Sequence, residues 1–322
     1  MKSIALLINS KSHQQSQSVV CNILISSIII LTVLVVFCQT ASASTLFETD
    51  GNGTINKISS TGIVTPFVTG LKGPTALAFD SSGTLFVLDK NSLTINKISS
   101  TGVVTPLVTD LQSPYDIAFG SSGDLFYADY NYSKIHKISS TGVVTTFADE
   151  FIFHPVALAF DASGTLFEAE FDGKINKISS TGVVTPFVTG LINPVALAFD
   201  SSGTLFEAEI KGTINKISST GVVTPFVTGL EVSPIALAFD SSDTLFELEL
   251  MGTINKISST GVVTPFVTGL RSPRKLAFDP DPATSTAVPK LFMIIGITVG
   301  CIVVLRMRKK HKAVKPHPSW KP

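Results

Sequence analysis

Residues 45–279 consist of short apolar runs separated by turn-forming residues. In the fourth and fifth copies of a recurring pattern the runs read TLFEAE, KINKIS, TPFVT and VALAFD, with DGK, SSTG, GLIN and DSSG between them. Short runs rich in Val, Ile, Thr and Phe, bounded by Gly, Ser, Asp and Asn, are typical of β-strands joined by tight turns. No stretch of this region has a 3.6-residue apolar period long enough for a helix. The pattern predicts an all-β domain.

The four-strand pattern occurs six times. Copies aligned on TLF or its equivalent start at residues 45, 84, 124, 165, 204 and 244, and the 17-residue segment INKISSTGVVTPFVTGL is identical from Ile175, Ile214 and Ile254. A fixed period of about 40 residues indicates a repeat architecture. Four strands per repeat, six times over, predict a six-bladed β-propeller of four-stranded antiparallel blades. Because each blade packs against its neighbours in the same way, the same residues recur.

Prolines predict the order of strands within a blade. Proline cannot donate a hydrogen bond to a β-ladder, so it belongs on an edge strand. The TPFVT run should therefore be the outer strand of each blade, and the ALAFD run the inner strand that lines the axis. Five copies carry the proline, at Pro66, Pro106, Pro186, Pro225 and Pro265.

The phase of the repeat predicts how the ring closes. The first copy begins on the second strand of a blade, at Thr45, and the last ends with the inner-strand run RKLAFD. The first blade therefore lacks an inner strand, and we expect residues 274–279 to supply it. Such pairing leaves no open sheet edge and ties the two ends of the domain together.

Apolar runs flank the repeats. We interpret residues 1–43, with apolar Val19–Cys38 followed by TASAS, as a signal peptide or, alternatively, an uncleaved signal anchor. Residues 44–280 form the propeller and 281–290 a linker; 291–307 are a predicted transmembrane anchor, and basic 308–322 a cytoplasmic tail. This organisation predicts an exported protein, single-pass at the cell membrane or cell surface, with the propeller outside. Cys21, Cys38 and Cys301 all lie in the apolar runs, so the predicted propeller contains no disulfide.

The charge of the repeats differs from that of the whole chain. The chain has a formal net charge of zero, but residues 45–279 hold 23 acidic and 14 basic residues, a net charge of about −9. An acidic domain repels phosphates, so we expect no nucleic-acid partner.

The segment NPVALAFDSSGTLFEAEIKGTINKISSTG, residues 193–221, resembles the NHL-type repeat, and the likeness covers all six copies. The resemblance implies the six-bladed propeller superfamily that includes gluconolactonase and regucalcin-type (SMP-30-like) hydrolases, virginiamycin B lyase and domains that only bind proteins or glycans. The C-terminal segment AVPKLFMIIGITVGCIVVLRMRKK resembles a bacterial PEP-CTERM sorting signal, with Lys290 after Pro289 where the motif has Pro-Glu-Pro.

The metal-dependent hydrolases of this superfamily place acidic and amide ligands just after the proline that opens each inner strand. A divalent cation needs several oxygen ligands, and the positions in this chain are mostly aliphatic or cationic. We therefore expect no metal or cofactor of the family type, calcium being the one cation considered. The positions are Thr75, Tyr115, Val156, Val195, Ile235 and Arg274.

Carboxylates near the end of each second strand form another candidate site. Such a ring could bind calcium or act as an acid–base pair. Each copy also carries a lysine on the adjacent strand, so we expect structural cross-strand ion pairs instead. The carboxylates are Asp50, Asp89, Asp129, Glu170, Glu209 and Glu249, preceded by Glu48, Glu168, Glu207 and Glu247; the lysines are Lys57, Lys97, Lys137, Lys177, Lys216 and Lys256.

The third copy and the segment that follows it depart most from the repeat, and all four tyrosines of the chain lie there. Aromatic clusters with a polar tip are typical of protein or sugar recognition. The alternative is simple sequence drift of this copy. The candidate recognition patch is Tyr115, Tyr127, Tyr130, Tyr132, Phe151, Phe153 and His154.

The sequence thus favours a non-enzymatic binding or structural module at the cell surface, anchored in the membrane, with a protein or glycan partner. It predicts no catalytic residues. The alternative function is a gluconolactonase-like hydrolase or lyase acting in the axial funnel, which depends on likeness of fold alone.

Overall fold

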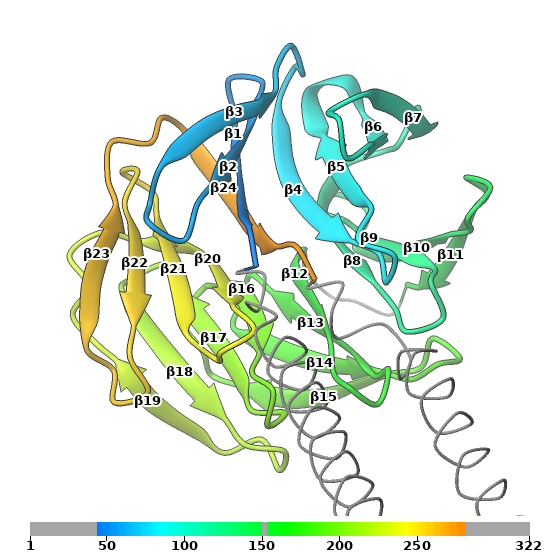
Figure 1. Ribbon diagram of the computed structural model, residues 1–322. Helices are drawn as coiled ribbons and strands as arrows, with labels where there is room; N and C mark the ends of the chain where they lie inside the picture. The colour runs from blue at the N-terminus through cyan, green and yellow to red at the C-terminus, as the bar shows by residue number, and fades with distance from the viewer. Residues whose placement is uncertain (1–43, 150–152, 281–322) are drawn as a thin grey trace, which may run out of the picture. The chain divides into compact units, whose positions relative to one another are not determined.

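The computed structural model describes residues 44–149 and 153–280, which form six four-stranded antiparallel sheets arranged around a central axis (Figure 1). This is the predicted six-bladed propeller. From inner to outer strand, the first blade is β24 (Pro273–Phe278), β1 (Leu46–Asp50), β2 (Thr54–Ile58) and β3 (Val64–Val68), and the second is β4 (Pro74–Phe79), β5 (Leu85–Asp89), β6 (Thr94–Ile98) and β7 (Val104–Val108). The third blade is β8 (Pro114–Phe119), β9 (Leu125–Asp129), β10 (Lys134–Ile138) and β11 (Val144–Ala148), and the fourth is β12 (Pro155–Phe160), β13 (Leu166–Glu170), β14 (Lys174–Ile178) and β15 (Val184–Thr189). The fifth blade is β16 (Pro194–Phe199), β17 (Leu205–Glu209), β18 (Thr213–Ile217) and β19 (Val223–Val227), and the sixth is β20 (Pro234–Phe239), β21 (Leu245–Glu249), β22 (Ile254–Ile257) and β23 (Val263–Val267).

The predicted strand order within the blades is confirmed. The strand that contains the ALAFD run, or its equivalent, is the innermost strand of each blade. The inner strands of neighbouring blades contact one another around the hub. All five TPFVT prolines lie on outer strands, where a missing N–H costs no ladder bond.

The C-terminal strand closes the ring as predicted, one residue earlier than expected. β24 pairs antiparallel with β1, with Leu46 opposite Phe278 and Glu48 opposite Leu276. Beyond the strands, the Asp279 N–H donates to the Thr45 carbonyl at 2.9 Å. The first blade therefore joins segments from the two ends of the described chain.

Phenylalanines link the blades into a continuous ring. The Phe after the first Leu of each second strand contacts the inner-strand Phe of the next blade, with ring centroids 4.8–5.3 Å apart. Five of these six contacts are edge-to-face and one is tilted, arrangements that aromatic pairs favour. The last contact, Phe246–Phe278, joins the sixth blade to the first through β24.

Aliphatic side chains fill the interfaces between neighbouring blades, here called the seams. Each of the six core clusters contains residues of two neighbouring blades. In the seam between the sixth and first blades, for example, Phe246 and Ile254 pack with Leu46 and Ile58. The core therefore lies between the sheets rather than within any one blade, and a single blade could not bury its faces alone.

Side chains of the turns explain the recurring SSTG and DSSG segments. Ser59 Oγ accepts the backbone N–H groups of Thr61 and Ile63, and Asp80 Oδ1 accepts those of Ser82 and Thr84. These local bonds satisfy backbone donors that would otherwise lack partners at a strand end.

The predicted signal segment, 1–43, and the predicted linker, anchor and tail, 281–322, lie outside the described residues. Within 44–149 and 153–280 the structure contains no helix with the length and hydrophobicity of a membrane span.

Truncation tests the closure. A chain ending at Ser272 lacks β24, so the first blade loses its inner strand. The contacts of β24 with the second and sixth blades are lost as well. We expect the loss of most of the propeller's stability, typically about 5–15 kcal/mol for a domain, and no cooperative transition in urea denaturation followed by circular dichroism. A chain ending at Pro280 is the control, and it should unfold cooperatively. Equal melting of the two chains would contradict the closure.

Candidate functional site

A cavity of about 450 Å³ lies at the end of the hub where the inner strands begin. Most of its lining comes from two sets of residues: the second residue of each inner strand, and residues of the turns that join second and third strands. Volumes of this size are common for small-molecule sites. The predicted axial positions all line this cavity: Thr75, Tyr115, Val156, Val195, Ile235 and Arg274.

The turn residues form a second, outer ring. Each occupies an equivalent position, because its backbone N–H donates to the carbonyl of the residue before an inner-strand proline. Four of them line the cavity; Tyr130 and Leu250 are the other two. The outer ring consists of Gly51, Lys90, Tyr130, Phe171, Ile210 and Leu250.

These two rings vary between blades, whereas the packed positions do not. The six residues of the outer ring are six different residue types, and the inner ring has five types among six positions. In contrast, the first Leu and the following Phe of the second strand are the same in all six blades, as are both Ile residues of the third strand. Packing between blades fixes the residue types in the seams. The residue types of the two rings, which form the mouth of the hub, are free to differ between blades.

The variation separates the cavity into two halves. The first three blades contribute polar, cationic or tyrosine side chains, notably Arg274, Lys90 and Tyr115. The fourth to sixth blades contribute apolar ones: Val156, Phe171, Val195, Ile210 and Ile235.

Two cations lie together in the polar half. Lys90 and Arg274 both line the cavity, and within the described residues neither forms an ion pair with a carboxylate. Burial lowers the pKa of Lys90, and the Arg274 charge lowers it further. Gly51 makes room for this arrangement, because a Cβ there would lie 3.0 Å from Arg274 Nε.

Three aromatic rings form a column beside these cations. Tyr115 stacks on Tyr130 with centroids 5.1 Å apart, and Tyr130 stacks on His154 at 4.3 Å. The Lys90 Nζ lies 4.7 Å from the Tyr115 ring centroid, within the range of a cation–π contact. His154 Nδ1 is 2.6 Å from the Tyr130 carbonyl oxygen, and this hydrogen bond holds the imidazole in place at the end of the column. The structure thus brings together three residues of the predicted patch.

The other residues of the patch lie elsewhere. Tyr132 and Phe153 are exposed, at 60% and 43%, and Phe153 lies beneath Lys174 with Nζ 4.9 Å from its centroid. Phe151 is outside the described residues. Tyr127, also a member of the predicted patch, is 2% exposed and stacks on His136, and it packs in the apolar cluster between the second and third blades. It is therefore not part of an exposed patch, because its strand position points into a seam.

An ion pair within the hub was not predicted. Lys275 Nζ lies 2.7 Å from Asp116 Oδ1, and Asp116 Oδ2 accepts the Leu158 N–H. Asp116 therefore connects the inner strands of the first, third and fourth blades. The sequence signal is that four blades carry alanine at this position, Ala76, Ala157, Ala196 and Ala236, while the other two carry opposite charges.

The cavity does not fit a divalent cation of the family type. Its inner ring is three aliphatic residues, a guanidinium, a phenol and a single aliphatic hydroxyl, and its one carboxylate, Asp116, is already paired with Lys275. Such a set falls short of the six to eight oxygens that calcium prefers. Among the described residues there is no group of three or more His, Cys, Asp or Glu side chains that could hold a metal.

The expected pairing of the second-strand acids with the third-strand lysines is wrong. The register places Lys57 opposite Phe47, and the two therefore share a face, while Glu48 lies opposite Asn56 on the other face. Lys57 Nζ lies 3.7 Å from the Phe67 centroid, and Lys177, Lys216 and Lys256 make the same contact at 3.9–4.0 Å. Lys137 does pair with a carboxylate, but with Asp124 rather than a ring member, at 2.7 Å.

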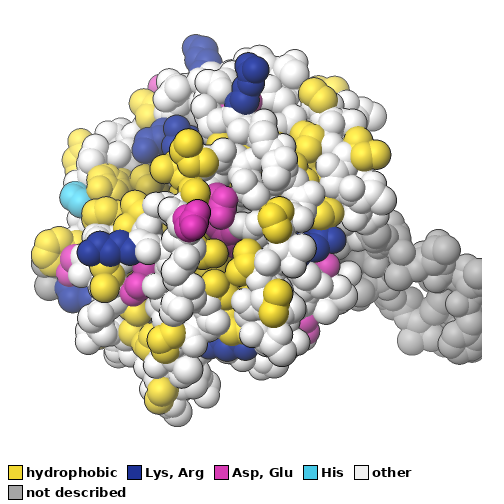
Figure 2. Space-filling view, turned by 90° about the vertical axis from the view of Figure 1, so that its left-hand side faces the viewer, with side chains coloured by type: hydrophobic (Ala, Val, Ile, Leu, Met, Phe, Trp, Pro, Cys, Tyr) yellow, Lys and Arg dark blue, Asp and Glu magenta, His cyan; other side chains and the backbone are white. Residues whose placement is uncertain are grey.

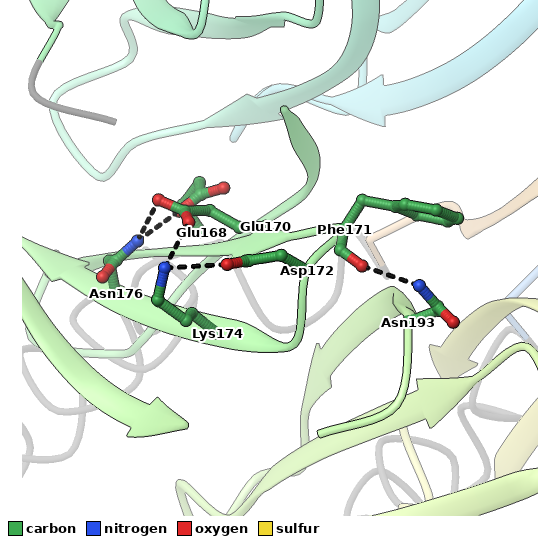
Figure 3. A network of polar contacts seen from close by, with 7 residues as sticks. All are labelled: Glu168, Glu170, Phe171, Asp172, Lys174, Asn176 and Asn193. Carbon is green, nitrogen blue, oxygen red and sulfur yellow. Dashed lines mark hydrogen bonds and ion pairs between the residues drawn. The ribbon is translucent and has the colours of Figure 1, made fainter. Parts of the chain in front are cut away.

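Buried glutamates bind asparagines instead. The Asn56 Nδ2 donates to Glu48 Oε2 at 2.8 Å, and the fourth, fifth and sixth blades repeat this bond. In the fourth blade Asn176 also donates to Glu170, which pairs with Lys174 (Figure 3). In each of the four glutamates the other oxygen, Oε1, has no hydrogen-bond partner. Burial raises the pKa of Glu48 to about 7 and that of Glu207 and Glu247 to about 8, and it raises that of Glu168 well above the ordinary value.

Acids at the end of the second strand hold the connections between blades. Asp89 accepts the backbone N–H groups of Lys72 and Gly73, and Glu209 accepts that of Ile192. The partners of these two carboxylates are backbone amides rather than the expected lysines.

Burial of acids also changes the surface. Nine acidic residues of the described part are buried, so the net charge overstates how acidic the exterior is. On the side drawn in Figure 2, hydrophobic side chains are scattered and both signs of charge are interspersed.

No protein-family model matches the chain, and no curated protein matches it. Among solved structures it is similar to a catalytically inactive virginiamycin B lyase from Staphylococcus aureus, with a TM-score of 0.57 and 18% identity over 76% of this chain and 94% of the lyase. It is also similar to a gluconolactonase from Xanthomonas campestris, with a TM-score of 0.59 and 12% identity over 73% of this chain and 88% of that chain. The fold resemblance inferred from the repeats is therefore confirmed.

Replacement of Asp116 tests the hub ion pair. Asp116→Ala leaves Lys275 without its partner, and breaking a buried pair typically costs about 3–5 kcal/mol; the partial exposure of Lys275 places the expected loss at the lower end. Asp116→Ala combined with Lys275→Ala restores the alanine of the other blades and should recover part of that loss. The free energy of unfolding in urea is the measurement. A double variant less stable than either single variant would contradict the pairing.

The buried glutamates predict a pH dependence. Their folded pKa values lie above 4.5, so the folded protein keeps protons that the unfolded chain releases. The free energy of unfolding should therefore fall as pH rises from about 4.5 to about 8. One pKa unit corresponds to about 1.4 kcal/mol. In urea titrations, Glu207→Gln should therefore reduce the loss of unfolding free energy over this pH range by a few kcal/mol. The exposed Glu231→Gln is the control. Identical slopes for both variants and the wild type would contradict the assignment.

Proposed function

We propose that this protein is a non-enzymatic binding module, held at the cell surface with the propeller outside, whose hub mouth recognises a protein or glycan partner. The supporting observation is the contrast between the seams, which repeat in all six blades, and the two mouth rings, which differ from blade to blade. Repetition serves packing, whereas a recognition site requires chemically distinct groups at defined positions.

The groups at the mouth suit recognition. Tyr115 offers a large ring held in place by Tyr130 and His154, and Arg274 offers a guanidinium that lines the cavity. Aromatic and arginine side chains in a desolvated pocket supply most of the binding energy in many interfaces. The apolar segments at 19–38 and 291–305 support the proposed surface location.

Fluorine NMR can test the proposed site, because the chain has four tyrosines. In full-length protein labelled with 3-fluorotyrosine, a partner at the mouth should shift the resonances of Tyr115 and Tyr130. The buried Tyr127 should not move and serves as the internal control. The panel should include acidic and neutral oligosaccharides, peptides and organic acids, with each resonance assigned by Tyr→Phe substitution.

A panel in which no ligand moves Tyr115 or Tyr130 would contradict the proposal. Chemical conversion of a ligand that binds there, abolished by Arg274→Ala or Tyr115→Phe, would instead favour the hydrolase or lyase alternative.

A further inference from the structure

The hub cavity is amphipathic, and its two halves differ in what they can bind. Lys90 and Arg274 lie in the polar half, contributed by neighbouring blades, and each lines the cavity. Val195, Ile210 and Ile235, from the fifth and sixth blades, form an apolar wall of the same cavity, and the sixth blade is next to the first, which carries Arg274. A ligand that fills this space meets positive charge on one side and aliphatic carbon on the other.

The cations lack a counter-charge among the described residues. The neighbouring carboxylate, Asp116, is already bound by Lys275 at 2.7 Å and by the Leu158 N–H. Lys90 and Arg274 carry like charges in the same cavity, and the Arg274 charge adds to burial in lowering the pKa of Lys90. An anionic group placed between them would remove this repulsion and accept charge-assisted hydrogen bonds.

The apolar wall and the size of the cavity restrict the rest of the ligand. Phe171 and Ile210 remain 38% and 37% exposed at the rim, and Val195 and Ile235 are only partly buried. Covering these side chains would be favourable, at about 0.8 kcal/mol per buried methylene of ligand. A volume of about 450 Å³ accommodates a chain of several carbons as well as its head group.

We propose that the hub cavity binds an amphiphilic organic anion, with a single carboxylate at Arg274 and Lys90 and an aliphatic chain along Val195 and Ile235. This inference rests on the proposed function, because it names the ligand class of the same mouth. The carboxylate and its chain are carried by the protein or glycan partner, and a medium-chain carboxylic acid serves as their probe.

Octanoate, acetate and 1-octanol separate the two contributions. Calorimetric titration of the full-length protein should show that octanoate binds more tightly than acetate, which has the carboxylate alone, and more tightly than 1-octanol, which has the chain without the charge. Hexanoate should bind up to about fifteenfold more weakly than octanoate, since it buries two fewer methylenes. Any partition of a probe into detergent or lipid is unchanged by one substitution in the cavity, so the variants report on the site.

Two variants with matched controls test the named contacts. Arg274→Ala should weaken octanoate binding by about tenfold or more, because it removes a charge-assisted bond, while leaving 1-octanol unchanged. Arg271→Ala, an exposed arginine outside the cavity, is its control. Val195→Thr should weaken octanoate by about threefold or more, since the near-isosteric hydroxyl costs desolvation. Val222→Thr, on an exposed turn outside the cavity, is the control.

The outcomes distinguish this inference from the proposed function. If octanoate fails to bind while another ligand of the panel shifts Tyr115, the ligand class is wrong and the mouth is still the site. Binding of octanoate that survives Arg274→Ala unchanged would also overturn the inference. If no ligand reaches Tyr115 or Tyr130, both proposals fail.

Discussion

The structure depends on ring closure by face-to-face packing of neighbouring blades. No blade has a core of its own, because every apolar cluster contains side chains from two sheets. The Phe246–Phe278 contact and the β24–β1 ladder complete the circuit between the sixth and first blades. Closure replaces the cross-links that a domain without cysteines cannot form.

This constraint explains where the repeats are identical and where they differ. A side chain in a seam must fit the next blade, and near-identical blades require near-identical seams. The constraint is weaker at the hub mouth, where Val156, Val195 and Ile235 pack against seam clusters but the equivalent positions of the other blades carry unlike side chains. Thr75, Lys90 and Arg274 can therefore occupy positions where other blades carry Val, Ile or Phe without disturbing the packing. The same logic applies within a seam, where Tyr127 and His136 replace the Glu–Asn pair of other blades as a matched stack.

Much of the fold could be predicted from the sequence, because the period, the prolines and the phase each have a direct structural meaning. Pro66 and its equivalents indicated the outer strands, and the final RKLAFD run indicated the closing strand. The polar pairs were harder. Strand alternation places Glu48 with Asn56 and Lys57 with Phe47, but this follows only once the register is known. The pair formed by Lys275 and Asp116 joins residues 159 positions apart, and no local pattern places two such residues in contact.

Native-state hydrogen exchange tests the central claim most directly. If the closed ring is one cooperative unit, the amides of Lys275 and Ala277, which face β1 from β24, should exchange only through global unfolding. Their free energies of opening and denaturant dependence should then match those of β13 in the fourth blade. Exchange of β24 by local opening, while β13 stays protected, would contradict the claim that closure holds the propeller together.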